Sequence, residues 1–297
     1  MHHAILGAGG IGGLIGAVLA HAGEQVTLIV RPESAARQPR QLSLESKLGN
    51  FTVPVAVEPV LTGPVDVLWI TVKATQLESA LESIPSDASV RGVVPLLNGI
   101  DHVSLLRKCF GHDRVIPATI SVESERTAPG LIVQRSPFVR LNVAESGKPL
   151  LASTLDLFDR FGFERKFIEN ESTLLWSKLA FLAPFALSTT AAGAPIGDVR
   201  KDPRRRKLLD SCIREACAVA NANNAGIKPD ALIATASQMP PEMRSSMQKD
   251  VEAGNPPELD AIAGPILRGG PEHGIPALAT QELVIEIRQK LKARAAG

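Results

Sequence analysis

Apolar and polar positions in the first thirty residues follow the order of a strand, a helix and a second strand. An apolar run at residues 3–9 leads into an alanine- and glycine-rich segment at 12–23, and a β-branched run follows at 25–30. A parallel strand buried on both faces is a nearly continuous apolar run, and a helix of small residues can lie close against a sheet. The chain therefore begins with a predicted β-α-β unit.

Similar apolar runs recur up to about residue 168. Residues 65–76 and 91–100 each have the pattern of a buried strand that ends in a polar turn. Residues 115–145 alternate apolar and polar positions around an Ala-Pro-Gly turn, which predicts a hairpin or an antiparallel edge that extends the sheet. Residues 148–170 then predict a helix and a short strand.

The pattern changes to helical periods after about residue 170. Five segments have helical length and spacing: residues 172–190, 203–224, 229–237, 257–268 and 279–294. We therefore predict two domains, residues 1–168 and 169–297, of which the second is all-helical.

Glycines occupy the predicted turn between the first strand and its helix. Gly7, Gly9 and Gly12 form the pattern G-x-G-x-x-G. In this pattern the first glycine allows a tight turn, the second lets a pyrophosphate approach the backbone, and the third lets helix and strand pack closely. The helix N-terminus adds free N–H groups, so Gly10 and Ile11 also become candidate cofactor-binding residues. The prediction is an α/β fold with an N-terminal Rossmann-type dinucleotide-binding domain; a merely structural glycine turn is the alternative.

Arg31 stands where the second strand ends, about 20 positions past the glycines. An acid at this place suits the ribose hydroxyls of NAD, whereas an arginine suits the 2′-phosphate of NADP. Arg31 therefore favours NADPH. Glu33, two residues further on, is an acid and argues against this preference for NADPH. The other alternative is that Arg31 binds no cofactor and only extends into solvent after the strand.

Polar side chains also follow the two later strands of the predicted sheet. Lys73 and Gln76 come after one strand and Asn98 after the next. Open α/β sheets bind their ligands at the carboxyl ends of strands, so all three are candidate site residues. The Asn98-Gly99 pair is also an ordinary turn signal.

Lys178 is the most informative residue of the helical half. It projects from an apolar stripe formed by leucines before it and by Phe181 and Leu182 after it. Burial of a lysine costs free energy unless the lysine is paired or its pKa falls. Such a lysine can serve as the general acid of a carbonyl reduction, or it can reach water past the stripe.

A second polar cluster lies between residues 244 and 262. Asn255 can cap a helix there, and Glu258, three residues on, can close a capping box. Ser245 and Gln248 can form a similar pair. Helix capping alone therefore explains why an acid occurs at Glu258. If Ser245 and Gln248 cap a helix, Ser246 beside them needs no catalytic role either.

Composition narrows the classes of function. The net charge is +1, so nothing global attracts nucleic acid or an anionic membrane. The chain has no tyrosine, which excludes Tyr-Lys chemistry, and its three cysteines and six histidines lack the spacing of metal ligands. We read the cysteines as reduced thiols of a cytoplasmic protein and find no stretch of the roughly 18–20 apolar residues that a membrane helix needs.

The sequence resembles the ketopantoate reductase (2-dehydropantoate 2-reductase) family. The resemblance rests on "GAGGIG", "VKATQ", "LLNGI", "WSKLA", "SSMQKD" and "ELD", in the family's order and near its spacing. It implies a Rossmann domain followed by a helical domain, and reduction of the 2-keto group of ketopantoate by NADPH on the way to pantothenate. It also implies a small 2-keto acid as the partner; a homodimer is a further possibility.

The resemblance also implies roles for the candidate residues. Carried over by position, Lys178 is similar to the general acid, Glu258 to the acid that contacts substrate and lysine, and Ser246 to a substrate-binding serine. Lys73, Gln76 and Asn98 match cofactor and active-site positions of the first domain, with Asn98 also on the substrate side.

Two positions depart from the family. The asparagines usually found four and eight residues after the lysine are here Leu182 and Ala186, and Pro184 between them is expected to distort the helix. The loss of two amides weakens the case for ketopantoate itself and leaves two alternatives: a reductase of a more apolar 2-keto acid or ketone, and an NADPH-binding sensor without turnover.

Overall fold

The computed structural model describes residues 1–296. Its contacts divide the chain into two units, Met1–Leu97 with His102–Leu174, and Asn98–Asp101 with Leu175–Gly297. The short segment Asn98–Asp101 therefore groups with the second unit, although it lies within the first half of the sequence. The domain ranges 1–168 and 169–297 stay a prediction.

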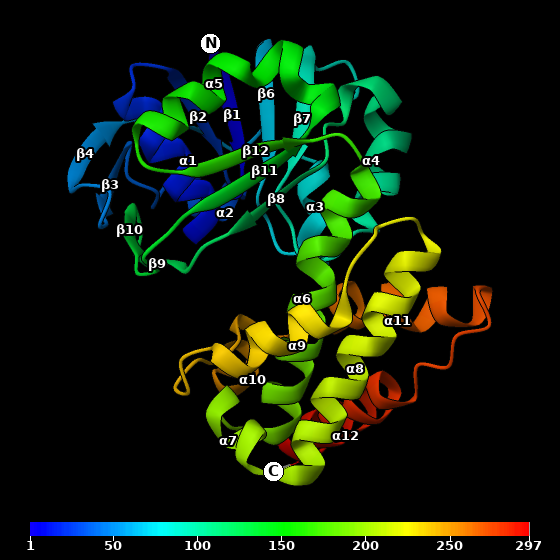
Figure 1. Cartoon of the computed structure of the whole chain (residues 1–297). Helices are drawn as coiled ribbons and strands as arrows, with labels where there is room; N and C mark the ends of the chain where they lie inside the picture. The colour runs from blue at the N-terminus through cyan, green and yellow to red at the C-terminus, as the bar shows by residue number, and fades with distance from the viewer. Residues whose placement is uncertain (297) are drawn as a thin grey trace. The chain divides into compact units, whose positions relative to one another are not determined.

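A five-stranded parallel sheet forms the centre of the first unit (Figure 1). Its strand order is β5-β2-β1-β6-β7, and all its pairs are parallel. The strands are β1 (His2–Leu6), β2 (Gln25–Ile29), β5 (Ala56–Glu58), β6 (Val65–Ile70) and β7 (Val90–Pro95). The predicted β-α-β unit is confirmed, with α1 (Gly10–His21) between β1 and β2. Because the order reverses beside β1, the carboxyl end of β1 is the switch point where such sheets bind ligands.

The strands predicted for residues 115–145 exist, but they belong to two other sheets, and an isolated parallel bridge between Val115 and Val93 joins the start of this segment to β7. β9 (Ser124–Ala128) and β10 (Leu131–Gln134) form the expected hairpin and join β3 (Gln41–Glu45) and β4 (Phe51–Pro54) in a second sheet. β8 (Ala118–Ser121), β11 (Arg140–Ala144) and β12 (Glu164–Ile168) form a third. The hairpin is thus confirmed, whereas the alternative of an antiparallel edge on the first sheet was wrong, because an alternating pattern shows which face is buried and not which sheet a strand joins.

The other elements of the first unit are short connections and surface helices. The α-helices are α2 (Pro32–Ala35), α3 (Leu77–Leu81), α4 (His102–Phe110) and α5 (Lys148–Arg160), and the 3₁₀ turns are η1 (Ala74–Gln76), η2 (His112–Arg114) and η3 (Glu145–Gly147). Side chains of α1, α5 and all three sheets meet in one apolar core, which contains Leu14, Trp69 and Phe158.

The second unit is helical, as predicted (Figure 1). Its helices are α6 (Glu171–Ala192), which begins in the first unit, α7 (Ile196–Lys201), α8 (Pro203–Ala222), α9 (Pro229–Gln238), α10 (Ser246–Glu252), α11 (Leu259–Glu272) and α12 (Leu278–Ala296). α8 packs on α7, α9, α11 and α12 around a core that includes Leu187, Ile213 and Leu283.

Helix α6 carries Lys178 and is the most apolar long helix of the described chain. By length and composition alone it could cross a membrane, which the sequence pattern did not lead us to expect. Yet 72% of its most apolar 18-residue window is buried inside the protein, which is typical of a core helix. α6 also continues through Pro184, and the predicted distortion of the helix at this residue stays a prediction.

Candidate active site

The glycine loop combines tight packing at two glycines with open space at a third. Gly7 has φ +101°, a left-handed conformation that favours glycine, and a Cβ there would lie 2.7 Å from Val72 Cγ1. A Cβ on Gly12 would collide with the carbonyl oxygen of Gly7. A Cβ on Gly9 would meet nothing within 4 Å. Gly7 and Gly12 thus serve close packing, whereas Gly9, the N-cap of α1, borders open space.

Two hydroxyl groups hold this loop, and sequence reasoning missed both. Thr71 follows β6 and its hydroxyl lies 2.7 Å from the carbonyl oxygen of Gly7 and 3.1 Å from that of Leu6. Ser124 donates a 2.9 Å hydrogen bond to the carbonyl oxygen of Gly10. A Cβ on Gly10 would collide with Ser124, and Ile11 packs against the apolar core. Thr71 was visible as the residue after a predicted strand, but no local pattern pointed to Ser124.

The other cofactor candidates lie beyond the carboxyl ends of strands. Arg31 is the N-cap of α2 just after β2, its side chain is 74% exposed, and its Nε lies 3.5 Å from the carboxylate of Glu33. Gly7 donates its N–H to Ile29 in the adjacent strand, so the glycine loop and the end of β2 are neighbours. Lys73 and Gln76 lie at the two ends of η1 after β6, the first half-buried and the second exposed.

Lys178, Asn98 and Glu258 form a hydrogen-bonded array in the second unit. The Lys178 ammonium donates to Asn98 Oδ1 at 3.0 Å, and Asn98 Nδ2 donates to Glu258 Oε2 at 2.9 Å. An ammonium can only donate and a carboxylate can only accept, so the amide of Asn98 has the one orientation that satisfies both. Asn98 therefore uses both ends of its amide to join lysine and acid, a role that its place after a strand did not indicate.

The segment that carries Asn98 lies against α11, the helix that follows Glu258. Gly99 has φ +82°, and a Cβ there would collide with the carbonyl oxygen of Ala261 in α11. Ile100 packs against the helical core. Asp101 forms an ion pair with Arg268, which also binds Asp260 at 2.8 Å. These contacts hold the segment Asn98–Asp101 against the start of α11.

Burial and charge together determine the acidity of Lys178. Burial lowers the pKa of Lys178 to about 8, and the negative charge of Glu258 opposes this shift. A lysine with this pKa is mostly protonated at neutral pH and still gives up its proton readily, as a general acid near its working pH must.

Glu258 does not close the predicted capping box. α11 begins at Leu259, and Glu258 is itself the N-cap residue, without a side-chain capping bond. Glu258 is instead buried, with 8% of the residue exposed, and its carboxylate accepts a hydrogen bond from Asn98. The capping assignment for Asn255 was wrong because residues 255–258 are not helical and the helix begins only at Leu259. The predicted pair of Ser245 with Gln248 is present, since Ser245 Oγ accepts from the N–H of Gln248 at 3.1 Å.

Ser246 and the two departures from the family lie along α6 and α10. Ser246 is exposed on the first turn of α10. Leu182 is half-buried and Ala186 is 1% exposed, both against the helical core. Spaced four and eight residues after Lys178, they share its side of α6. That side therefore carries hydrocarbon side chains at the two positions where the sequence departs from the family that it resembles.

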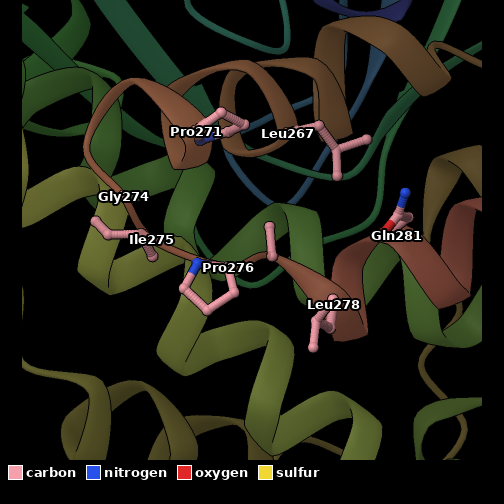
Figure 2. A pocket seen from close by; sticks show the side chains of 8 residues that line it. Leu267, Pro271, Gly274, Ile275, Pro276, Leu278 and Gln281 are labelled. Carbon is pink, nitrogen blue, oxygen red and sulfur yellow. The ribbon is translucent and has the colours of Figure 1, made fainter.

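Two surface hollows do not coincide with these residues. One, of about 390 Å³, lies where the end of α11 leads into α12 and is lined mainly by apolar side chains such as Leu267, Ile275 and Leu278 (Figure 2). The other, of about 520 Å³, lies between the segments that precede β6 and β7, at the amino ends of those strands. No titratable side chain lines the first, so it offers no group for acid-base chemistry.

Comparison with known proteins decides the family. Residues 3–147 match the profile described as ketopantoate reductase PanE/ApbA, and residues 171–291 match the profile of its C-terminal part. The chain belongs to the ketopantoate reductase family. A relative from Caulobacter vibrioides, a 2-dehydropantoate 2-reductase, is 30% identical over 289 residues, which span 95% of this chain and 96% of the relative.

Solved structures agree with this family fold. A PanE/ApbA family ketopantoate reductase from Ralstonia eutropha JMP134 has a TM-score of 0.86 at 24% identity, covering 99% of this chain and all of that chain. A D-mandelate dehydrogenase, solved with NADH and anilino(oxo)acetate, has a TM-score of 0.85 at 21% identity and covers 99% of both chains. The predicted fold class and family are confirmed, and the protein is an oxidoreductase of that family.

Proposed function

We propose that this ketopantoate reductase family member reduces ketopantoate to pantoate with NADPH, a step toward pantothenate. The observation that carries the proposal is the Lys178–Asn98–Glu258 array, because it presents a positioned and acidified ammonium group. NADPH supplies the hydride that adds to the 2-keto carbon. The keto oxygen gains charge in this step and needs a proton.

Lys178 provides that proton in our proposal. Its N–H groups that do not bind Asn98 are available to polarise the keto oxygen, and transfer of one proton completes the 2-hydroxy acid. Asn98 accepts a hydrogen bond from the ammonium and so favours its charged, correctly oriented form. Glu258 holds the far end of the Asn98 amide and supplies a negative charge that raises the pKa of the lysine against the effect of burial.

The first unit has the features that a dinucleotide needs. Gly9 borders open space at the N-terminus of a helix of 12 residues, and Gly7 and Gly12 leave room only for backbone. A pyrophosphate at this point would meet free N–H groups and the positive end of the helix dipole. Arg31, exposed after β2, suits the 2′-phosphate of NADPH. The carboxylate of the exposed Glu33 lies beside Arg31 and competes with that phosphate for the guanidinium.

A specific observation favours a second candidate substrate, a more apolar 2-keto acid. Leu182 and Ala186 replace two asparagines on the side of α6 that carries Lys178. The fold does not choose between the candidates, since a ketopantoate reductase and a D-mandelate dehydrogenase both have it. Ser246 would bind the carboxylate in either case, because both candidates are 2-keto acids.

The test is NADPH oxidation at 340 nm with a matched pair of substrates. Ketopantoate and 3,3-dimethyl-2-oxobutanoate differ by a single hydroxyl, and phenylglyoxylate extends the series to an aromatic group. Sites that hydrogen-bond a substrate hydroxyl reject the analogue without it by about 10⁴-fold, whereas apolar sites discriminate by about 100-fold or less. A strong preference for ketopantoate supports the first candidate, and a preference for the apolar acids supports the second. The same assay with NADH in place of NADPH tests which cofactor the enzyme uses.

A cytoplasmic location and a homodimer stay predictions.

A further inference from the structure

Two buried hydroxyl groups connect α6 with the start of α10. Thr189 is fully buried and Ser245 is 2% exposed, and their side-chain oxygens lie 2.9 Å apart. Thr189 belongs to the helix of Lys178, and Ser245 is the N-cap of the helix whose first residue is Ser246. Buried hydroxyls need partners, so this pair joins the two helices at a defined point.

The neighbours of the pair determine the direction of each hydrogen bond. The N–H of Gln248 can only donate, so Ser245 Oγ accepts from it at 3.1 Å. The carbonyl oxygen of Phe185 can only accept, so the Thr189 proton points to it at 2.9 Å. The Ser245 proton is then left for Thr189 Oγ1. Three bonds in one direction run from the backbone of α10 to the backbone of α6.

The attachment point lies on the side of α6 that carries Lys178. Thr189 is eleven residues after Lys178, about three turns and about 16 Å along the axis. Leu182 and Ala186 lie between them on that side. Ser246, next to Ser245 and exposed, is therefore placed relative to Lys178 by the Thr189–Ser245 pair.

We propose that Thr189 and Ser245 are positioning residues, which hold Ser246 where it binds the carboxylate of the 2-keto acid. This rests on the proposed function, since it takes Ser246 as a substrate residue. Both act through Ser246 and touch neither the keto group nor the cofactor. Their loss should therefore weaken substrate binding and leave the proton transfer from Lys178 in place.

The test compares three conservative variants on α6. Thr189→Val keeps the shape and removes the hydroxyl, Thr189→Ser keeps the hydroxyl, and Thr190→Val is the matched control. Thr190 is 2% exposed and its hydroxyl has no hydrogen-bond partner among the described residues. For Thr189→Val we expect the KM for the keto acid to rise about tenfold to a hundredfold, as for a small displacement of a binding group. The kcat and the KM for NADPH should stay within about threefold, since the acid and the cofactor loop are intact. Thr189→Ser and Thr190→Val should match wild type.

A double variant separates positioning from general stability. If Thr189 acts through Ser246, the KM of Thr189→Val/Ser246→Ala should equal that of Ser246→Ala alone, because coupled residues are not additive. An unchanged KM in a folded Thr189→Val protein, or full additivity, would overturn the proposal. Should Thr189→Val not fold, Ser245→Ala takes its place with the same readouts. No turnover of any keto acid by wild type would instead refute the proposed function, and this proposal with it.

Discussion

The glycine loop and the Lys178 array are built in opposite ways. The loop is made of backbone within six consecutive residues, and its fit depends on where a Cβ has no room. The array is made of side chains from residues 98, 178 and 258, which only the folded chain joins, through hydrogen bonds of 3.0 Å from Lys178 to Asn98 and 2.9 Å from Asn98 to Glu258. One short motif therefore contains the whole backbone loop, whereas the residues of the side-chain array are spread over the sequence.

The largest effect should follow from removing the acid of the array. Lys178→Ala takes away the proposed proton donor, so kcat should fall by about 10²- to 10⁴-fold. The affinity for NADPH should hardly change, since the glycine loop lies in the other unit. Stopped-flow kinetics and fluorescence titration measure the two quantities. Lys207→Ala, at an exposed lysine of α8, is the control, and turnover equal to wild type in Lys178→Ala would refute the role.

The glycine loop can be tested for packing and for binding separately. Gly12→Ala should lose about 1–3 kcal/mol or more of unfolding free energy, because its Cβ meets the carbonyl oxygen of Gly7. Gly9→Ala should stay within about 0.5 kcal/mol of wild type, since its Cβ meets nothing, yet it should lose NADPH affinity. Urea unfolding and NADPH titration measure the pair. Normal NADPH affinity in Gly9→Ala would contradict the proposal that the pyrophosphate of the cofactor binds beside Gly9.

Arg31 tests which dinucleotide the loop serves. Arg31→Ala should weaken NADPH about tenfold or more, the usual effect of losing a hydrogen bond to a charged group, and leave NADH affinity unchanged. Isothermal titration with both cofactors measures this, with the exposed Arg37→Ala as control. Equal losses for the two cofactors would exclude a contact with the 2′-phosphate.

The smallest expected effect concerns substrate choice beside the array. Leu182→Asn restores one amide on the Lys178 side of α6. We expect the ratio of kcat/KM for ketopantoate over 3,3-dimethyl-2-oxobutanoate to rise about tenfold, the value of one hydrogen bond. Leu267→Asn makes the same change of leucine to asparagine on α11, and this control should leave the ratio unchanged. A ratio that Leu182→Asn leaves unchanged would place the substrate away from this side of the helix.

The contrast between the local glycine loop and the long-range Lys178 array also explains which features could be predicted from the sequence. Apolar runs and glycine spacing predicted the parallel sheet and the helical second unit, because both depend on patterns of a few neighbouring residues. The assignment of β8 to β12 to separate sheets depends on long-range pairing, which alternation does not encode. Lys178 stood out because a cation in an apolar stripe is costly. Glu258 was explained by a local capping box, and only the fold shows that its carboxylate turns to Asn98 instead.

The pH dependence of kcat/KM in wild type and Glu258→Gln tests the array most directly. The free-enzyme acid must be protonated to act, and Lys178 has a pKa of about 8, so wild-type kcat/KM should fall as the pH rises through about 8. Glu258 raises the pKa of the lysine, so Glu258→Gln should shift this fall to lower pH, while Glu272→Gln at the end of α11 should not. A profile that is flat through this range, or one that Glu258→Gln leaves in place, would contradict Lys178 as the acid held by Asn98 and Glu258.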